Sequence, residues 1–128
     1  MKELRMKVIE TNTDDKLKAF AIAKRKDTVK ATDFVKVPFR CDYYVITENT
    51  ITDTETGEVS TMNCITFLGS SDGTDVCIGT NSKSVIKDFR EIMDLLKDME
   101  QEINSVQLMI NQGKSRSGNT FNGIEIVF

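Results

Sequence analysis

The chain has 128 residues, of which 39% are hydrophobic, and this length and composition are typical of one compact domain with a single core. No segment approaches the roughly 18 consecutive apolar residues of a membrane-spanning helix, and residues 1–5 lack the apolar stretch of a secretory signal, so we expect a soluble, intracellular protein without membrane partners. The net charge is −3, but basic side chains outnumber acidic ones by 11 to 6 in residues 1–40 and by 2 to 1 in residues 105–128, whereas acidic ones lead by 13 to 4 in residues 41–104.

The first 40 residues are expected to form a basic extension packed on the rest of the domain. Within them, residues 16–26 are compatible with two structures, because Ala and Lys favour a short helix whereas the alternation of Phe20 and Ile22 favours a strand. The single proline, Pro38, lies in an expected connection. The sequence therefore leaves helix and strand open for residues 16–26.

Three strands are predicted in the next part of the chain. Residues 41–51, 59–68 and 74–80 are each rich in β-branched or aromatic side chains. A turn around Gly57 separates the first two, and Asp72-Gly73 separates the second from the third, because Asp-Gly tolerates the positive φ angles of tight hairpins. The three segments are therefore expected to form consecutive hairpins.

An amphipathic helix is predicted from Ser82 to about Ile103, because apolar residues recur there every three or four positions. These positions are Val85, Phe89, Ile92, Leu96, Met99 and Ile103. Asn81 or Ser82 is expected to cap the first turn. We interpret the apolar stripe as part of the core rather than as a binding face for a cofactor or partner.

Two further strands are predicted over residues 105–112 and 119–128, joined by a polar loop at residues 113–118. From residue 41 the order is strand, strand, strand, helix, strand, strand, which is that of an OB-fold, a five-stranded Greek-key barrel. We therefore expect a mainly β fold in which residues 41–128 form an OB-like barrel. The 1–40 extension completes one folding unit, and the loop at 113–118, with the turn at 53–58, would flank the ligand face.

The sequence offers little for catalysis. It has no histidine, which removes the commonest general base and the commonest transition-metal ligand. The three cysteines, Cys41, Cys64 and Cys77, are widely spaced, odd in number and outside any C-x-x-C pair, so we expect reduced, mostly buried thiols.

Two short motifs resemble binding loops but are incomplete. Asp72 and Asp75 flank a glycine, but the further oxygen ligands and the closing glutamate of a calcium loop are missing. Gly113-Lys114-Ser115 resembles the end of a phosphate-binding loop, but Leu108 stands where the first glycine is needed and no helix follows. We therefore expect a protein that is not an enzyme and that has no catalytic residue, no metal and no cofactor.

Binding of a single nucleic-acid strand needs cations that follow the phosphates and flat side chains on which bases stack. The cations can come from Lys114 and Arg116 and from the cluster at residues 24–26. The uneven distribution of charge could place these groups along one groove. A mixed-charge surface without any charged partner fits the same counts.

Strand alternation selects the aromatic side chains that could stack. If Ile124, Ile126 and Phe128 point into the core, Phe121 lies on the other, wetter face of the same strand.

The same reasoning applies to the earlier strands. Phe67 shares a face with Thr61 and Asn63, which suggests a wetter face, and one ring of Tyr43-Tyr44 must point outward because neighbours in a strand alternate. Each of these rings could instead pack in a second small core against residues 1–40.

The end of the sequence has a recognisable pattern. Gln112-Gly113, Ser115, Gly118-Asn119 and Phe121 resemble the terminal hairpin of single-stranded DNA-binding proteins from small protein-primed tailed bacteriophages of the phi 29 type. The similarity continues upstream and covers roughly residues 59–128. It includes Thr66-Phe67, Asp72-Gly73, Ser82-Lys83, Asp88 and Leu95-Leu96, in that order.

This resemblance implies sequence-independent coating of single-stranded DNA during phage replication, in the cytoplasm of the infected bacterial host and alongside phage replication proteins. It adds Ser115 and Asn119 to the candidate site. The candidate DNA-binding residues are Lys24, Arg25, Lys26, Tyr43, Tyr44, Phe67, Lys114, Ser115, Arg116, Asn119 and Phe121.

Two features depart from the family pattern. Residues 1–40 are longer and more basic, and the strand tyrosines expected for stacking do not fall clearly on Tyr43 or Tyr44. An alternative function is therefore open: a phage-encoded inhibitor of a host defence or nucleic-acid enzyme, which would use the acidic residues 41–104 to mimic nucleic acid.

Overall fold

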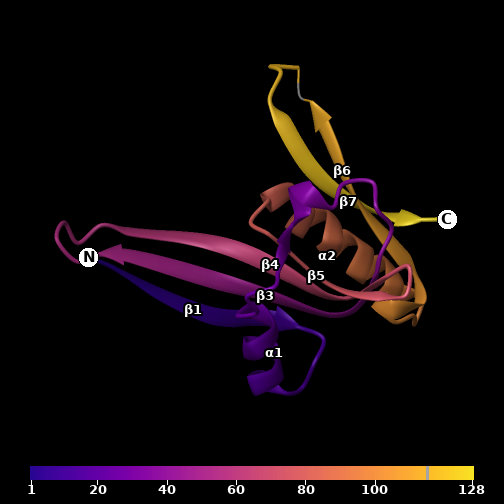
Figure 1. Ribbon diagram of the computed structural model, residues 1–128, viewed down its shortest axis with the longest axis horizontal. Coiled ribbons are helices and arrows are strands. Elements are labelled where there is room, and N and C mark those ends of the chain that lie inside the picture. The colour runs from indigo at the N-terminus through magenta and orange to yellow at the C-terminus, as the bar shows by residue number, and fades with distance from the viewer. Residues whose placement is uncertain (115) are drawn as a thin grey trace.

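Five strands form one twisted sheet in the order β1-β3-β4-β5-β2 (Figure 1). The computed structural model describes residues 1–114 and 116–128. The strands are β1 (Lys2–Thr11), β2 (Val29–Lys30), β3 (Arg40–Asp53), β4 (Val59–Ser71) and β5 (Thr74–Thr80). All neighbours pair antiparallel except β2 and β5, which are parallel. A separate antiparallel hairpin pairs β6 (Gln107–Lys114) with β7 (Thr120–Val127).

The predicted mainly β fold and its element order from residue 41 are confirmed. The strands expected at 41–51, 59–68 and 74–80 correspond to β3, β4 and β5, and the last two correspond to β6 and β7. Within the described residues, however, the strands do not close into a barrel. The short strand β2 pairs with β5 through Val29 and Lys30, and it occupies the edge at which a closing strand would have to pair.

Two isolated backbone bridges connect the β6–β7 hairpin to the chain that leads into β3. Val35 pairs with Ile110, and Phe39 pairs with Leu108. The Phe39 amide donates to the Leu108 carbonyl at 2.8 Å, and the Leu108 amide donates back at 2.7 Å. The base of the hairpin is therefore fixed to the sheet, whereas its other end projects away from it (Figure 1).

Residues 16–26, for which the sequence left two structures open, contain helix α1 (Lys16–Ala23). Asp15 caps this helix, because its carboxylate accepts from the amides of Leu17 and Lys18 at 3.0 and 3.1 Å. Ala19 and Ile22 pack against Val45 of β3 in a small cluster on one face of the sheet. The helix therefore covers that face near the inner end of β1.

Helix α2 (Lys83–Asp98) lies on the opposite face of the sheet and is shorter than predicted. Ser82 caps it by accepting from the Val85 amide at 3.3 Å. The helix ends near Met99, and Glu100 has a positive φ of 55°, which turns the chain away. Ile103 is buried as predicted, but it lies in a separate short 3₁₀ helix, Ile103–Ser105.

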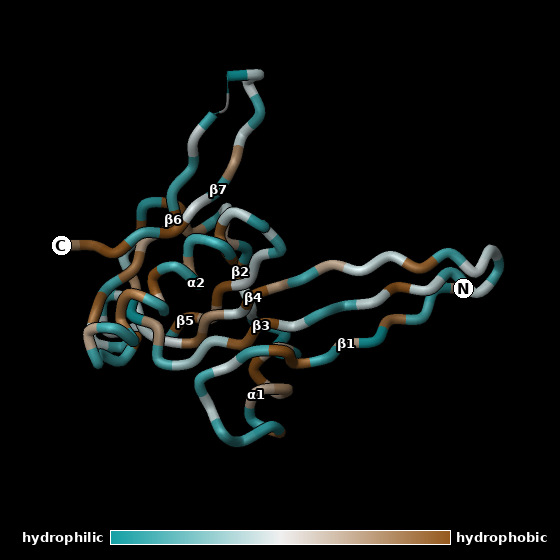
Figure 2. The backbone as a smooth tube through the Cα atoms, turned by 180° about the vertical axis from the view of Figure 1, so that it is seen from behind, coloured by the Kyte–Doolittle hydropathy of each residue, from teal (hydrophilic) through white to brown (hydrophobic). Residues whose placement is uncertain are grey.

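The main core fills the space between α2, the sheet and the base of the hairpin (Figure 2). Phe89 of α2 is at its centre, with ring centroids 4.8 Å from Tyr44 and 5.1 Å from Phe67. Ile124 of β7 is buried as predicted, but Phe128 is fully exposed, so the expectation that it points into the core is wrong. The hairpin strand leaves the core before its last residue.

Beyond the helices, β1, β3 and β4 continue as a three-stranded arm (Figure 1). We define the arm as residues 2–7 of β1, 48–53 of β3 and 59–64 of β4. β5 begins to pair with β4 only at Ile65, so the arm has one free edge on β1 and another on β4. The strand β1 was not predicted from the sequence.

The three thiols are free, as expected. Cys41 and Cys77 are buried and Cys64 is half-buried. Burial raises the pKa of the Cys41 thiol far above its ordinary value, and it also raises that of Cys64. These groups therefore behave as small apolar side chains near neutral pH.

Candidate nucleic-acid interface

The projecting end of the β6–β7 hairpin carries cations in solvent. Lys114 ends β6, and Arg116 and Asn119 lie in the following turn; all three are exposed. Ser115, which the resemblance adds to the site, lies outside the described residues. Gly118 has a φ of 84°, a conformation that only glycine adopts without strain, so the turn needs this residue.

Phe121 lies on the outer face of the hairpin, as predicted, with 50% of its surface exposed. It pairs directly with Gly113 across the ladder. A Cβ added to Gly113 would lie 2.8 Å from the Phe121 Cζ atom, so the end of the ring covers the glycine. The absence of a side chain at Gly113 therefore lets the ring lie across β6 while it remains accessible to a ligand.

Lys36 is a second cation on this face, and it is not among the residues predicted for the site. Its ammonium group donates to the Asn111 side-chain oxygen at 3.0 Å, and its amide donates to the Ile110 carbonyl at 2.9 Å. Asn111 shares the face of Gly113 and Phe121, because side chains two residues apart on a strand point the same way. Lys36, Asn111 and Phe121 thus place a cation, an amide and an aromatic ring on one surface.

A polar cleft of about 550 Å³ lies below the other face of the hairpin. Residues 28–32, the end of β5 and Asn122 of β7 line it, and Lys30 supplies a cation. The Asn122 side-chain oxygen is buried without a hydrogen-bond partner. Such an acceptor is usually satisfied by water or a ligand, which makes the cleft a candidate for polar contacts.

A second groove of about 800 Å³ separates the arm from α2. Lys83, Lys87 and Arg90 line it from the helix. Glu48, Glu91 and Asp94 line it as well, so its charge is mixed. Asn81 borders both this groove and the polar cleft, which therefore adjoin one another.

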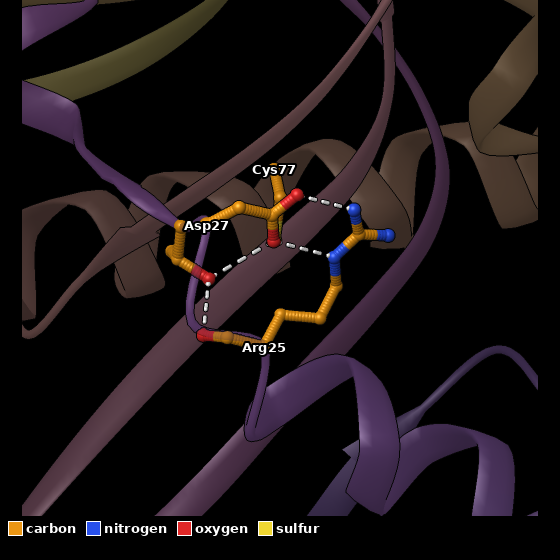
Figure 3. Close-up of polar contacts among 4 residues, drawn as sticks. Arg25, Asp27 and Cys77 are labelled. Atoms are coloured by element: carbon orange, nitrogen blue, oxygen red, sulfur yellow. Dashed lines mark hydrogen bonds and ion pairs between the residues drawn. The ribbon is translucent and has the colours of Figure 1, made fainter.

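The basic cluster at residues 24–26 is not brought to the hairpin turn. It follows directly on α1, which lies at the opposite end of the molecule from that turn in both views (Figures 1 and 2). Arg25 is also paired: its guanidinium contacts the Asp27 carboxylate at 2.6 and 2.8 Å (Figure 3). This contact lowers the pKa of Asp27, and the pair reduces the net charge that the cluster offers to phosphate.

Two of the predicted stacking residues are unavailable. Phe67 is only 1% exposed and lies beneath α2, so its expected position on a wet face is wrong. Tyr44 is 6% exposed, and burial raises the pKa of its hydroxyl. Both rings pack against Phe89 and therefore belong to the core.

Tyr43 is the tyrosine that points the other way, towards α1. Its ring is half-buried in the small cluster of α1, and the Lys18 ammonium lies 3.8 Å from the ring centroid. This cation–π contact already occupies one face of the ring, where a base would otherwise have to stack. The accessible predicted residues therefore form two separate groups: Lys114, Arg116, Asn119 and Phe121 on the hairpin, and Lys24 and Lys26 beside α1.

In the described part of the chain, no three cysteine, aspartate or glutamate side chains are grouped so as to hold a metal ion. No helix among those residues is long and apolar enough to cross a membrane. Comparison with known proteins adds no assignment: no family model, no curated protein and no solved structure matches this chain.

Proposed function

We propose that this protein binds single-stranded DNA without sequence preference and that the β6–β7 hairpin is the centre of the binding surface. The observation that carries the proposal is the half-exposed ring of Phe121, which is held across Gly113 on the same face as the Lys36–Asn111 pair. A ring beside cations is the combination that single-strand binders use for bases and phosphates.

The two adjoining hollows extend the surface away from the hairpin. A strand that leaves Phe121 would have to pass around the hairpin to its other face, where it can follow the polar cleft past Lys30 to Asn81 and then enter the groove beside Lys83 and Lys87. The described residues show no ion pair for Lys83 or Lys87, so both cations are available to phosphates. These contacts would neutralise charge rather than identify bases.

The element order supports an open variant of the OB-fold, in which β3, β4, β5, β6 and β7 take the places of the five barrel strands. The resemblance of the hairpin residues to those of phi 29-type proteins leads us to propose a role in coating displaced strands during phage replication, within the host cytoplasm. Coating of this kind protects the strand from nucleases and favours unwinding, and it requires no catalytic group.

Phe121→Ala is expected to weaken binding of poly(dT) by about 1–3 kcal/mol, because one stacked base loses its platform. The salt dependence should change little, since no charge is removed. Fluorescence anisotropy with a labelled oligonucleotide measures both quantities. Phe20→Ala is the matched control: Phe20 is also exposed and lies 5.8 Å from a lysine ammonium, but it is on α1. Equal losses in the two variants would exclude a specific platform at Phe121.

Replacing Lys114 and Arg116 together by Ala should weaken binding and reduce its dependence on salt. Each phosphate contact contributes a log–log slope of about −0.7 on a single strand, so loss of two contacts should reduce the slope by roughly 1.4. The comparison is a double alanine variant of Lys24 and Lys26, which carries the same charge change. A larger loss in that variant would move the site to residues 1–40. If the unmodified protein does not bind poly(dT) at low salt, the inhibitor alternative takes precedence.

A further inference from the structure

The outer edge of β1 is open along the arm. No described strand pairs with it, and nothing lies beside it in Figure 1. The Thr54 amide donates to the Met1 carbonyl at 2.9 Å, which identifies Met1 and Thr54 as a hydrogen-bonded pair. Hydrogen-bonded pairs recur at every second residue of an antiparallel ladder, so the backbone groups of Glu3 and Arg5 point towards β3. Those of the intervening even-numbered residues point outward without partners.

The two faces of this edge strand differ in character. Leu4 is 60% exposed, and it lies on the same face as Ile51, its partner in β3. Glu3 and Arg5 lie on the opposite face, because neighbours in a strand alternate. An open edge with one apolar and one charged face can pair with another strand only where both faces match.

We propose that a second copy of this chain pairs with this edge, antiparallel to β1, about a two-fold axis at Leu4. Outward backbone groups belong to even-numbered residues, so a symmetric pairing must be centred on a single residue, and the central residues of this segment are Glu3, Leu4, Arg5 and Met6. Centring on Leu4 places Glu3 opposite the partner's Arg5, twice by symmetry. Centring on Glu3 places two glutamates opposite each other. Centring on Arg5 places Glu3 opposite the partner's Lys7 but also sets two arginines opposite each other, and centring on Met6 places Arg5 opposite the partner's Lys7. Of these four centres, Leu4 alone pairs opposite charges without placing like-charged side chains directly opposite each other, and this selects it.

The pairing joins the two five-stranded sheets into one continuous sheet and fills the unpaired edge with about six backbone hydrogen bonds. A two-fold axis perpendicular to the sheet keeps the Leu4 faces of both copies on the same side, so their exposed apolar side chains adjoin. The contact is shorter than a standard protein interface, so the dimer is expected to be reversible and concentration-dependent. This inference does not depend on DNA binding.

The first test is sedimentation velocity of the full chain without DNA over a series of concentrations. The unmodified protein should pass reversibly from monomer to dimer. Glu3→Arg and Arg5→Glu should each weaken the dimer about tenfold or more, because attractive pairs become repulsive. The combination of both changes restores opposite charges and should restore the dimer. All of these side chains are exposed, so folding should be unaffected.

The second test fixes the register. In a hydrogen-bonded pair the two Cα atoms are about 5.5 Å apart, within the range of a disulfide. Leu4→Cys should therefore form a covalent dimer under mild oxidation, and Met6→Cys, which lies opposite the partner's Lys2, should not. A monomer at every concentration, or a dimer insensitive to the charge changes, would overturn the proposal. Growth beyond the dimer would also overturn it, because pairing of β1 with the free edge of β4 in another copy gives an open chain.

Discussion

Phe89→Ala is expected to lower the free energy of unfolding by about 3–5 kcal/mol, as large-to-small changes of a buried phenylalanine do. Phe89 is completely buried, and its ring contacts those of Tyr44 and Phe67. Its removal leaves a cavity between α2 and the sheet that two large neighbours cannot fill without moving. Urea unfolding followed by circular dichroism measures the change.

The control for this substitution is Phe20→Ala on α1. It removes the same atoms from a ring that is 46% exposed, so the expected loss is about 0.5 kcal/mol. A small loss at Phe89 would mean that the core described between α2 and β4 is not formed in solution. A large loss at Phe20 would mean that its ring packs against a surface absent from this structure.

Gly69→Ala is expected to destabilise the protein by at least about 1–3 kcal/mol, the usual range for a side chain forced into packed structure. A Cβ at Gly69 would overlap the carbonyl oxygen of Arg40 and would lie 2.8 Å from its carbonyl carbon. Both obstacles are backbone atoms, so β3 and β4 would have to separate next to the bulge between Cys41 and Tyr43. A lower urea midpoint is the expected result.

Gly123→Ala offers the matched comparison, because the same methyl group meets a movable neighbour. Its Cβ would lie 2.8 Å from a carboxylate oxygen of Asp88, which can rotate away. We expect a change within about 0.5 kcal/mol. Similar losses at both glycines would show that backbone contact is not what distinguishes Gly69.

Local patterns were sufficient to predict the order of the elements from residue 41 onward and to place the cap of α2 at Asn81 or Ser82, of which Ser82 is the residue that caps it. They also contained a signal for β1, since Leu4, Met6 and Val8 alternate with charged residues, but this alternation was not interpreted as a strand. Whether the barrel closes depends on a long-range strand contact, which local patterns do not reveal. The two-residue strand β2 pairs with β5, and no periodicity can be read from a segment that short.

The candidate site was predictable where each face of a strand keeps the same environment, buried or exposed, along its length. Ile124 of β7 is buried, and Phe121, an odd number of positions before it, points to the opposite face of the strand. The exposure of Phe121 followed from this alternation. Phe67 was placed wrongly because β4 runs from the arm into the core. Thr61 and Asn63 share its face but are exposed, whereas Phe67 lies under α2. Lys36 was missed because its partner Asn111 is 75 residues away in sequence.

The arm also determines what optical measurements can detect. The chain has two tyrosines and no tryptophan, and both tyrosines lie at the inner end of β3, next to the helices. Amides of the arm lie in strands with no helix covering them, so they can open locally without disturbing the core. A melting curve read from tyrosine fluorescence therefore reports on the main core through Tyr44 and on the small α1 cluster through Tyr43, but not on the arm. Loosening of the arm would pass unnoticed in that signal, and amide hydrogen exchange resolved by residue is needed to detect it.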